Sequence, residues 1–219
     1  MLRCFYLLLR HCKGSTEETI FSIEIMRTFF FFLFLIVTLT GGAETLTYEM
    51  FLWGDKIGTM TITKTDKEDG TEFYVLDSKA KAKILWVVRD NAAHMETSFK
   101  NGKMVSCFQQ EIENGTVKRW NRVTLNGDKY NVDGYKGKRS FTEVPSFAVA
   151  PIYFKGLANI KRLFYEAEAD FVNVEKVDDN TCEFKASDGS RNVYHFKNGR
   201  AESMEFHVSI ATVKMIRVN

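Results

Sequence analysis

Three histidines, His94, His195 and His207, carry the most versatile side chains of the chain beyond its N-terminal segment. Zinc sites usually contain a closely spaced pair such as His-x-His or Cys-x-x-Cys, and the sequence contains neither. His195 and His207 lie at unequal distances from the Asn198-Gly199 turn, so we do not expect them to face each other. We therefore interpret the three as solvated strand residues and predict neither a metal site nor a cofactor.

Cys107 and His94 could act as a nucleophile and its general base, because both lie on predicted strands that flank one turn. Nothing near Cys107 in the sequence indicates a helix N-terminus or a reactive loop that would activate the thiol. The sequence also lacks a Gly-x-Ser-x-Gly elbow and a phosphate-binding loop. We therefore predict no catalytic residues, and a hydrolytic enzyme is the weakest function considered.

Three carboxylates, Glu166, Glu168 and Asp170, are spaced two residues apart and would share one face of a strand. A calcium site would fit such a group, but the Asp-x-Asp-x-Asp-Gly loop is missing. The ordinary interpretation is that the three carboxylates lie on a solvated face of the strand, where their like charges repel each other.

Two basic clusters could face anionic lipid head groups or acidic glycans. Their members are Lys118, Arg119 and Arg122 in the first, and Lys136, Lys138 and Arg139 in the second. We favour the interpretation that both clusters lie on the solvent-exposed side of strands and turns. The whole chain has a formal net charge of only +2, which gives no general electrostatic reason to bind nucleic acid.

The segment Met26–Ala43 has the organisation of a secretory signal peptide: a start Met, one basic residue, an apolar core and small residues before the cut. Its apolar core, Thr28–Thr40, is shorter than the about 20 residues of a membrane-spanning helix. We therefore expect translation to start at Met26 and cleavage after Ala43. An uncleaved anchor and a long leader including residues 1–25 are the alternatives.

The expected mature chain, Glu44–Asn219, would be periplasmic or secreted, with no transmembrane span. Its two cysteines, Cys107 and Cys182, could pair in an oxidising compartment. Cys107 alternates with the polar side of its segment and Cys182 with the apolar side of its own, so the sequence leaves the pairing open.

From Glu44 onward, apolar and polar residues alternate with a period of two, which is typical of half-buried strands. Asn-Gly pairs, the strongest hairpin signal, recur along the chain at Asn101-Gly102, Asn114-Gly115, Asn126-Gly127 and Asn198-Gly199. The alternation is interrupted once, at Pro145–Leu157. We predict a short helical crossing there and also consider its extension through Ala158–Tyr165. So many antiparallel strands exceed what a flat sheet holds. We therefore predict one all-β domain over 44–219, a curled antiparallel sheet or partial barrel with one short helical crossing.

One predicted strand carries charges on one face and small or apolar residues on the other. The small residues leave room above their face for a helix, a large side chain or a ligand. We predict that this face and the crossing line a ligand cavity through Tyr74, Leu76, Ser78, Ala80, Ala82, Ile152 and Phe154. A barrel with this many strands tends to leave an interior unless side chains fill it. The leading hypothesis is therefore a non-enzymatic protein that holds a lipid or another amphipathic small molecule. A structural or interaction module with an envelope protein partner is the alternative, and a filled core with an exposed patch would favour it.

Three stretches carry a resemblance across the expected mature chain: Tyr48–Ile62 with its two glycines, Pro151–Gly156, and Tyr194–Arg200 with Met204. On these the chain resembles a group of uncharacterised exported bacterial proteins classed only as a domain of unknown function. The resemblance implies a curled antiparallel sheet loosely similar to the half-barrels of lipoprotein-carrier proteins, and it implies no catalytic residues. No Cys lies at the cleavage site, which separates the chain from anchored lipoprotein receptors of that type.

Overall fold

The computed structural model describes residues 42–84, 87–156, 160–208 and 211–219, and these residues form one compact unit. The expected signal segment Met26–Ala43 lies almost wholly outside the described residues and stays a prediction. No helix in the described ranges is long and apolar enough to cross a membrane.

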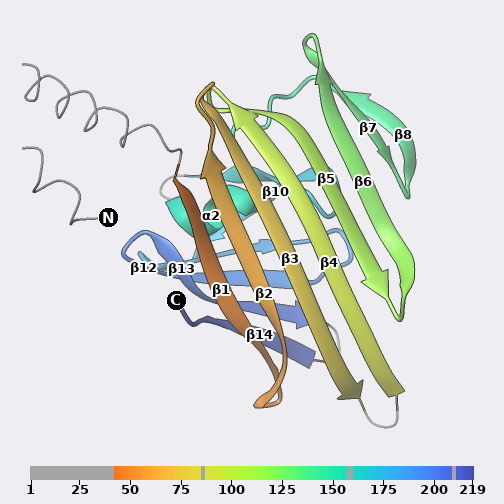
Figure 1. Ribbon diagram of the computed structural model, residues 1–219, viewed down its shortest axis with the longest axis vertical. Helices are drawn as coiled ribbons and strands as arrows, with labels where there is room; N and C mark the ends of the chain where they lie inside the picture. Colours follow the sequence, from red (N-terminus) through yellow and green to blue (C-terminus); the bar gives the residue numbers. More distant parts are fainter. Residues whose placement is uncertain (1–41, 85–86, 157–159, 209–210) are drawn as a thin grey trace, which may run out of the picture. The chain divides into compact units, whose positions relative to one another are not determined.

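One antiparallel sheet of fourteen strands makes up most of the described chain (Figure 1). Its strands are β1 (Ala43–Leu52), β2 (Asp55–Asp66), β3 (Thr71–Ile84), β4 (Val87–Lys100), β5 (Lys103–Glu113), β6 (Thr116–Asn126), β7 (Lys129–Gly134), β8 (Gly137–Phe141), β9 (Arg162–Tyr165), β10 (Asp170–Lys176), β11 (Thr181–Lys185), β12 (Arg191–Lys197), β13 (Arg200–Val208) and β14 (Ala211–Arg217). The spatial order is β8-β7-β6-β5-β4-β3-β2-β1-β14-β13-β12-β11-β10-β9. The first and last strands of the chain therefore pair in the middle of the sheet.

The predicted alternation sets which face of each strand is buried. Tyr48, Met50 and Leu52 of β1 are buried, and their neighbours in the strand are not. Three of the four predicted Asn-Gly turns have the backbone that such turns need; in the first of them Asn101 has φ 52° and Gly102 has φ 72°. At the remaining pair, Asn126 ends β6, and Gly127 and Asp128 form the turn. The turns fix the register, and the register directs one face of every strand inward.

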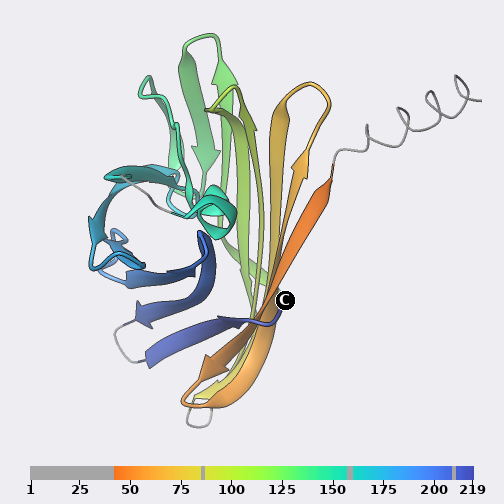
Figure 2. The same ribbon diagram turned by 90° about the vertical axis from the view of Figure 1, so that its left-hand side faces the viewer.

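The sheet curls until its two edge strands approach each other, but it does not close (Figure 2). The edge strands β8 and β9 share no ladder; aromatic side chains bridge them instead. The ring of Phe141 on β8 lies 5.8 Å from that of Phe164 on β9 and 5.7 Å from that of Phe171 on β10. The predicted all-β class, a curled sheet with one short helical crossing, is thereby confirmed.

The short helix α2 (Val149–Lys155) lies inside the curl (Figure 2). The ring of its Tyr153 lies 5.7 Å from that of Tyr48 on β1 and 6.0 Å from that of Tyr194 on β12. The helix ends at Gly156, whose left-handed φ of 64° stops it. An extension of the helix through Tyr165 is wrong over Arg162–Tyr165, because these residues form β9 and pair with β10.

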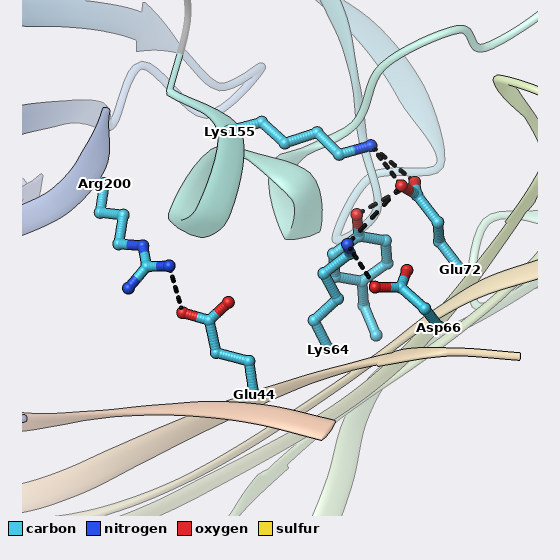
Figure 3. Close-up of polar contacts among 7 residues, drawn as sticks. Glu44, Lys64, Asp66, Glu72, Lys155 and Arg200 are labelled. Carbon is cyan, nitrogen blue, oxygen red and sulfur yellow. Dashed lines mark hydrogen bonds and ion pairs between the residues drawn. The ribbon is translucent and has the colours of Figure 1, made fainter. Parts of the chain in front are cut away.

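Ion pairs hold the end of α2 against the sheet (Figure 3). Lys155 Nζ lies 2.6 Å from Glu72 Oε2 of β3, and Lys64 Nζ of β2 lies 2.9 Å from Asp66 Oδ2 and 3.8 Å from Glu72 Oε1. Arg200 of β13 pairs with Glu44 of β1 at 2.8 Å. Charged side chains therefore gather over the inner face at this end of the strands.

Candidate functional site

The inner face changes character toward the end of the sheet where β1 finishes at Leu52, which we call the Trp53 end. Ser78, Ala80 and Ala82 of β3 and Ala93 of β4 face inward there and are half-buried. Gly58 of β2 lies opposite Ala80. We call these five residues the small-residue floor. Because their side chains are short, they occupy little of the space above the sheet.

Different chemistry flanks the floor on its two sides. Toward β1, β14 and β13, the inward residues Leu52, Val213 and Phe206 are apolar, and they are neighbours in register. Toward β5 and β6, Arg89 pairs with Glu113, and Arg119 Nε lies 3.8 Å from Glu111 Oε2. The inner face at the Trp53 end is therefore amphipathic, with apolar and charged side chains on opposite sides of a small-residue strip.

The predicted lining residues divide into two groups. Tyr74, Leu76 and Ile152 are buried in the hydrophobic core, and Phe154 is half-buried against it, with its ring 5.9 Å from that of Tyr74. Ser78, Ala80 and Ala82 belong to the floor. The structure thus places all seven on the inner side of the molecule, but α2 and aromatic rings cover the part of β3 around Tyr74.

Gly58 lets two strands approach closely at the floor. A Cβ built on Gly58 would lie 2.0 Å from the carbonyl oxygen of Lys79 and 2.7 Å from the Cα of Ala80. Real Cβ atoms do not come this near to backbone, so no other residue fits without moving β3. The β1–β2 register also shifts nearby, between Met50 and Phe51, and such irregularities bend and twist a sheet.

Three inward amides leave a buried polar atom without a hydrogen-bond partner among the described residues. The atoms are Gln109 Oε1, Asn121 Oδ1 and Asn192 Nδ2, on β5, β6 and β12. Their side chains are 6%, 1% and 3% exposed. Buried polar groups almost always have a partner, in the protein or in bound water or ligand. These three atoms are enclosed, so any partner would have to be buried in the interior with them.

A buried carboxylate, that of Glu166, joins the turn after β9 to helix α2. Its Oε2 accepts the N–H of Val149 and its Oε1 accepts the N–H of Ala150, both at 3.0 Å. The hydroxyl of Thr97 donates to the same Oε1 at 3.3 Å. Burial outweighs these bonds and raises the pKa of Glu166 to about 7.

The interpretation of Glu166 and Glu168 as a solvated face is wrong. Glu166 is fully buried and Glu168 is 6% exposed, while Asp170 is exposed. The reason is that both glutamates lie in the turn between β9 and β10, not on a strand. Glu168 Oε1 accepts the backbone N–H and the hydroxyl of Ser187 at 2.9 and 2.7 Å.

The same turn is bound by two side chains from the other edge of the curl. Arg139 of β8 donates to the carbonyls of Glu168 and Ala169 at 3.0 and 2.6 Å. Asn121 Nδ2 of β6 donates to the carbonyl of Ala167 at 2.8 Å. We call these contacts the seam, because they hold the curl together where no ladder does.

Cys107 and His94 lie on opposite faces of the sheet. Cys107 is buried beside Thr97 and Glu166, and burial raises the pKa of its thiol well above the ordinary value. His94 points outward and bonds Asp77 at 2.8 Å, and this bond raises its pKa. Cys107 is inward, contrary to its polar-side pattern, and both Cys107 and Cys182 are free thiols.

The other candidate residues are dispersed. His195 bonds the hydroxyl of Thr181, and His207 bonds that of Thr212, so each has its own partner. Within the described ranges, no three His, Cys, Asp or Glu residues converge as metal ligands would. The basic clusters also divide: Arg119 and Arg139 face inward, whereas Arg122 lies on Phe108, with 4.9 Å from Cζ to the ring centroid.

A pocket of about 210 Å³ lies between β10 and β11, lined by Asn173, Glu175, Glu183, Phe184 and Lys185. Sites for drug-sized ligands usually exceed about 300 Å³ and are mostly apolar. The lining here is mainly charged, so this pocket does not suit an apolar ligand.

The curled, unclosed antiparallel sheet with an internal helix defines a barrel-like class of β proteins. A solved structure of this class, the crystal structure of a beta-barrel-like protein of domain of unknown function DUF1849 from Brucella abortus, is similar to this chain with a TM-score of 0.51. It shares 15% sequence identity, and the match covers 83% of this chain and 98% of that one. The likeness concerns the fold alone.

The chain belongs to the DUF6134 family, a domain of unknown function, whose family model matches residues 48–218. The match therefore begins within β1 and ends just after β14. A comparison with curated proteins found no match. The expected membership in an uncharacterised domain family with a barrel-like fold is confirmed.

Proposed function

We propose that this chain is an exported, non-enzymatic protein that binds an apolar or amphipathic ligand on the small-residue floor. The observation that carries the proposal is the contrast along β3. Tyr74 is fully buried beneath Phe154 of α2, whereas Ser78, Ala80 and Ala82 face inward and stay half-buried. Small inward residues leave volume that a ligand can fill, and burying that apolar surface would stabilise the complex.

The surroundings of the floor favour an amphipathic ligand over a purely apolar one. Phe206 and Val213 supply an apolar side for a hydrocarbon chain. Arg89 and Arg119 lie on the other side, each with a glutamate partner, and can hydrogen-bond a polar head group. A few placed polar groups in a mostly apolar site are typical of ligand sites.

The proposal of export comes from the composition of Met26–Ala43. The proposal of a non-enzymatic role is supported by the separation of Cys107 from His94, which lie on opposite sides of the sheet.

The filled half of the interior favours a second candidate, an interaction module of the cell envelope that acts through its surface. Tyr48, Tyr74, Tyr153 and Tyr194 are all buried and in mutual or shared contact around α2. If side chains also fill the space above the floor, no ligand can enter. The two candidates therefore differ in one measurable property, the occupancy of the floor.

Native mass spectrometry of the full chain, purified from a membrane-containing host, tests the proposal. We expect an adduct of lipid mass that organic extraction removes. Ala82→Trp should abolish the adduct by filling the space over the floor. Thr59→Trp adds the same ring on the exposed outer side of β2 and should retain it. A clean mass for the wild-type chain, also after incubation with a lipid mixture, would contradict the proposal and favour the second candidate.

A further inference from the structure

The first turn of α2 depends on an acceptor from outside the helix. The first N–H groups of a helix have no partner within it, and the side chain of the N-cap residue usually supplies one. Here the N-cap residue is Ala148, whose side chain cannot do so, and Pro151 in the first turn carries no N–H. The N–H groups of Val149 and Ala150 bond to the carboxylate of Glu166 instead, both at 3.0 Å. One side chain of the β9–β10 turn therefore caps the internal helix.

This capping carboxylate has no counter-charge. Glu166 is 0% exposed, and no cation among the described residues forms an ion pair with it. Arg139 of the seam bonds backbone carbonyls of the turn, and Lys155 at the other end of α2 pairs with β3. The second carboxylate of the turn, Glu168, bonds to Ser187. A carboxylate that is buried without a cation costs free energy even where it accepts hydrogen bonds.

The groups that face Glu166 keep their protons near neutral pH. These groups are Cys107 of β5, Tyr153 of α2 and Tyr165 of β9, and burial raises the pKa of each above its ordinary value. Thr97 of β4 donates its hydroxyl to Glu166 and does not titrate. Burial raises the pKa of Glu166 itself to about 7. Within this buried cluster, Glu166 is therefore the group that changes its charge in the neutral range.

We propose that Glu166 is a proton-controlled latch on the internal helix. The neutral side chain keeps the first turn of α2 closed against the β9–β10 turn. When the proton leaves to solvent, the first turn of α2 separates from the β9–β10 turn and water enters to hydrate the carboxylate. The latch thereby makes the interior drier at acid pH and wetter at alkaline pH.

The sign of the pH dependence follows from proton linkage. The closed form, in which the pKa of Glu166 is about 7, binds the proton more tightly than an open form in which the pKa has its ordinary value of 4.5. The opening equilibrium therefore rises as the pH rises from 4.5 to about 7, and then levels off. Between pH 6 and pH 8 it should rise about tenfold.

Hydrogen exchange at the amides of Val149 and Ala150 tests the latch, because Glu166 binds these two N–H groups. NMR of the full chain without ligand resolves them individually. After correction for the intrinsic pH dependence of exchange, we expect their protection to be about tenfold lower at pH 8 than at pH 6. Low concentrations of urea should hardly change it, since a local opening exposes little surface. The amide of Tyr48, in the middle of the sheet, is the reference for global unfolding and should lose protection as urea is added.

Two variants separate the latch from general effects of pH. Glu166→Gln has no proton to release, so the protection of Val149 and Ala150 should be the same at pH 6 and pH 8, whatever its level. Glu175→Gln, on an exposed carboxylate of β10, should keep the wild-type change. The wild-type comparison needs no variant, so it tests the latch even if Glu166→Gln does not fold.

Three results would overturn the proposal. They are equal protection of the wild-type amides at pH 6 and pH 8, a tenfold change that persists in Glu166→Gln, and a urea dependence at Val149 as steep as that at Tyr48. The last result would mean that the helix opens only when the whole domain unfolds. None of them bears on the ligand proposal, which rests on the small-residue floor.

Discussion

The carboxylate of Glu166 lies 3.0 Å from the amide nitrogen of Ala150, so the turn between the edge strand β9 and its neighbour β10 binds the first turn of the internal helix. The contact spans residues from two separate segments and is fully buried. It joins α2 to the seam, where Arg139 and Asn121 hold the same turn from the other edge of the curl. The seam and the helix therefore depend on each other.

Glu166 should make stability depend on pH between about 4.5 and 7. Its pKa is raised from 4.5 to about 7 in the folded state. The folded state then binds this proton more tightly than the unfolded state, so the free energy of unfolding is highest below pH 4.5. It falls as the pH rises to about 7 and then levels off, a loss of about 3 kcal/mol from this group.

Glu166→Gln should remove that slope, because an amide does not titrate. Urea unfolding at several pH values measures the difference between variant and wild type, which cancels the contribution of His94 at the upper end of the range. Glu175→Gln, on an exposed carboxylate of β10, is the control and should keep the wild-type slope. An identical slope in the Glu166 variant would contradict a buried, proton-binding carboxyl.

Arg139→Gln should destabilise the seam. Its guanidinium donates to two carbonyls of the β9–β10 turn, and hydrogen bonds that involve a charged group contribute about 1.5–3 kcal/mol. We expect an unfolding free energy lower by that amount and faster hydrogen exchange in Glu166–Ala169. Lys138→Gln, next in sequence and highly exposed, should change neither quantity. If both variants behaved alike, the seam would not hold the curl.

Gly58→Ala should destabilise the sheet by about 1–3 kcal/mol, because a Cβ there collides with the backbone of β3. Thr59→Ala is the control, because Thr59 is the next residue of β2 and its side chain is exposed on the outer face. Thermal unfolding of both variants measures the difference. Equal midpoints would show that β2 and β3 are not in close contact at this point.

Cys107 and Cys182 should resist thiol reagents in the folded protein. Both are buried, and burial raises the pKa of Cys182 to about 12, so little thiolate forms near neutral pH. Alkylation of the native chain followed by peptide mapping should leave both unmodified, and alkylation in denaturant should modify both. Rapid native labelling of Cys107 would instead point to an accessible, activated thiol and revive a catalytic hypothesis.

Local sequence signals predicted much of the fold. The Asn-Gly turns and the alternation along β1 and β3 are short-range features, and they determined the strands, the turns and the inward face. The break at Pro145–Leu157 indicated the helix. The pairing of β1 with β14 could not be predicted, because it joins residues at opposite ends of the domain.

The site was predicted in part, for a similar reason. Ser78, Ala80 and Ala82 follow from alternation, but the cover over Tyr74 depends on where Phe154 packs. Glu166 and Glu168 carry no local signal of burial, because their partners, Ala150 and Ser187, belong to other segments.

Photo-crosslinking of the full chain with a diazirine-bearing fatty acid tests the ligand site most directly. The account predicts crosslinks on the peptides that contain Ser78–Ala82 and Phe206, displaced by unlabelled fatty acid and lost in Ala82→Trp. Crosslinks that lie only on the outer face, or that unlabelled fatty acid does not displace, would contradict binding on the small-residue floor.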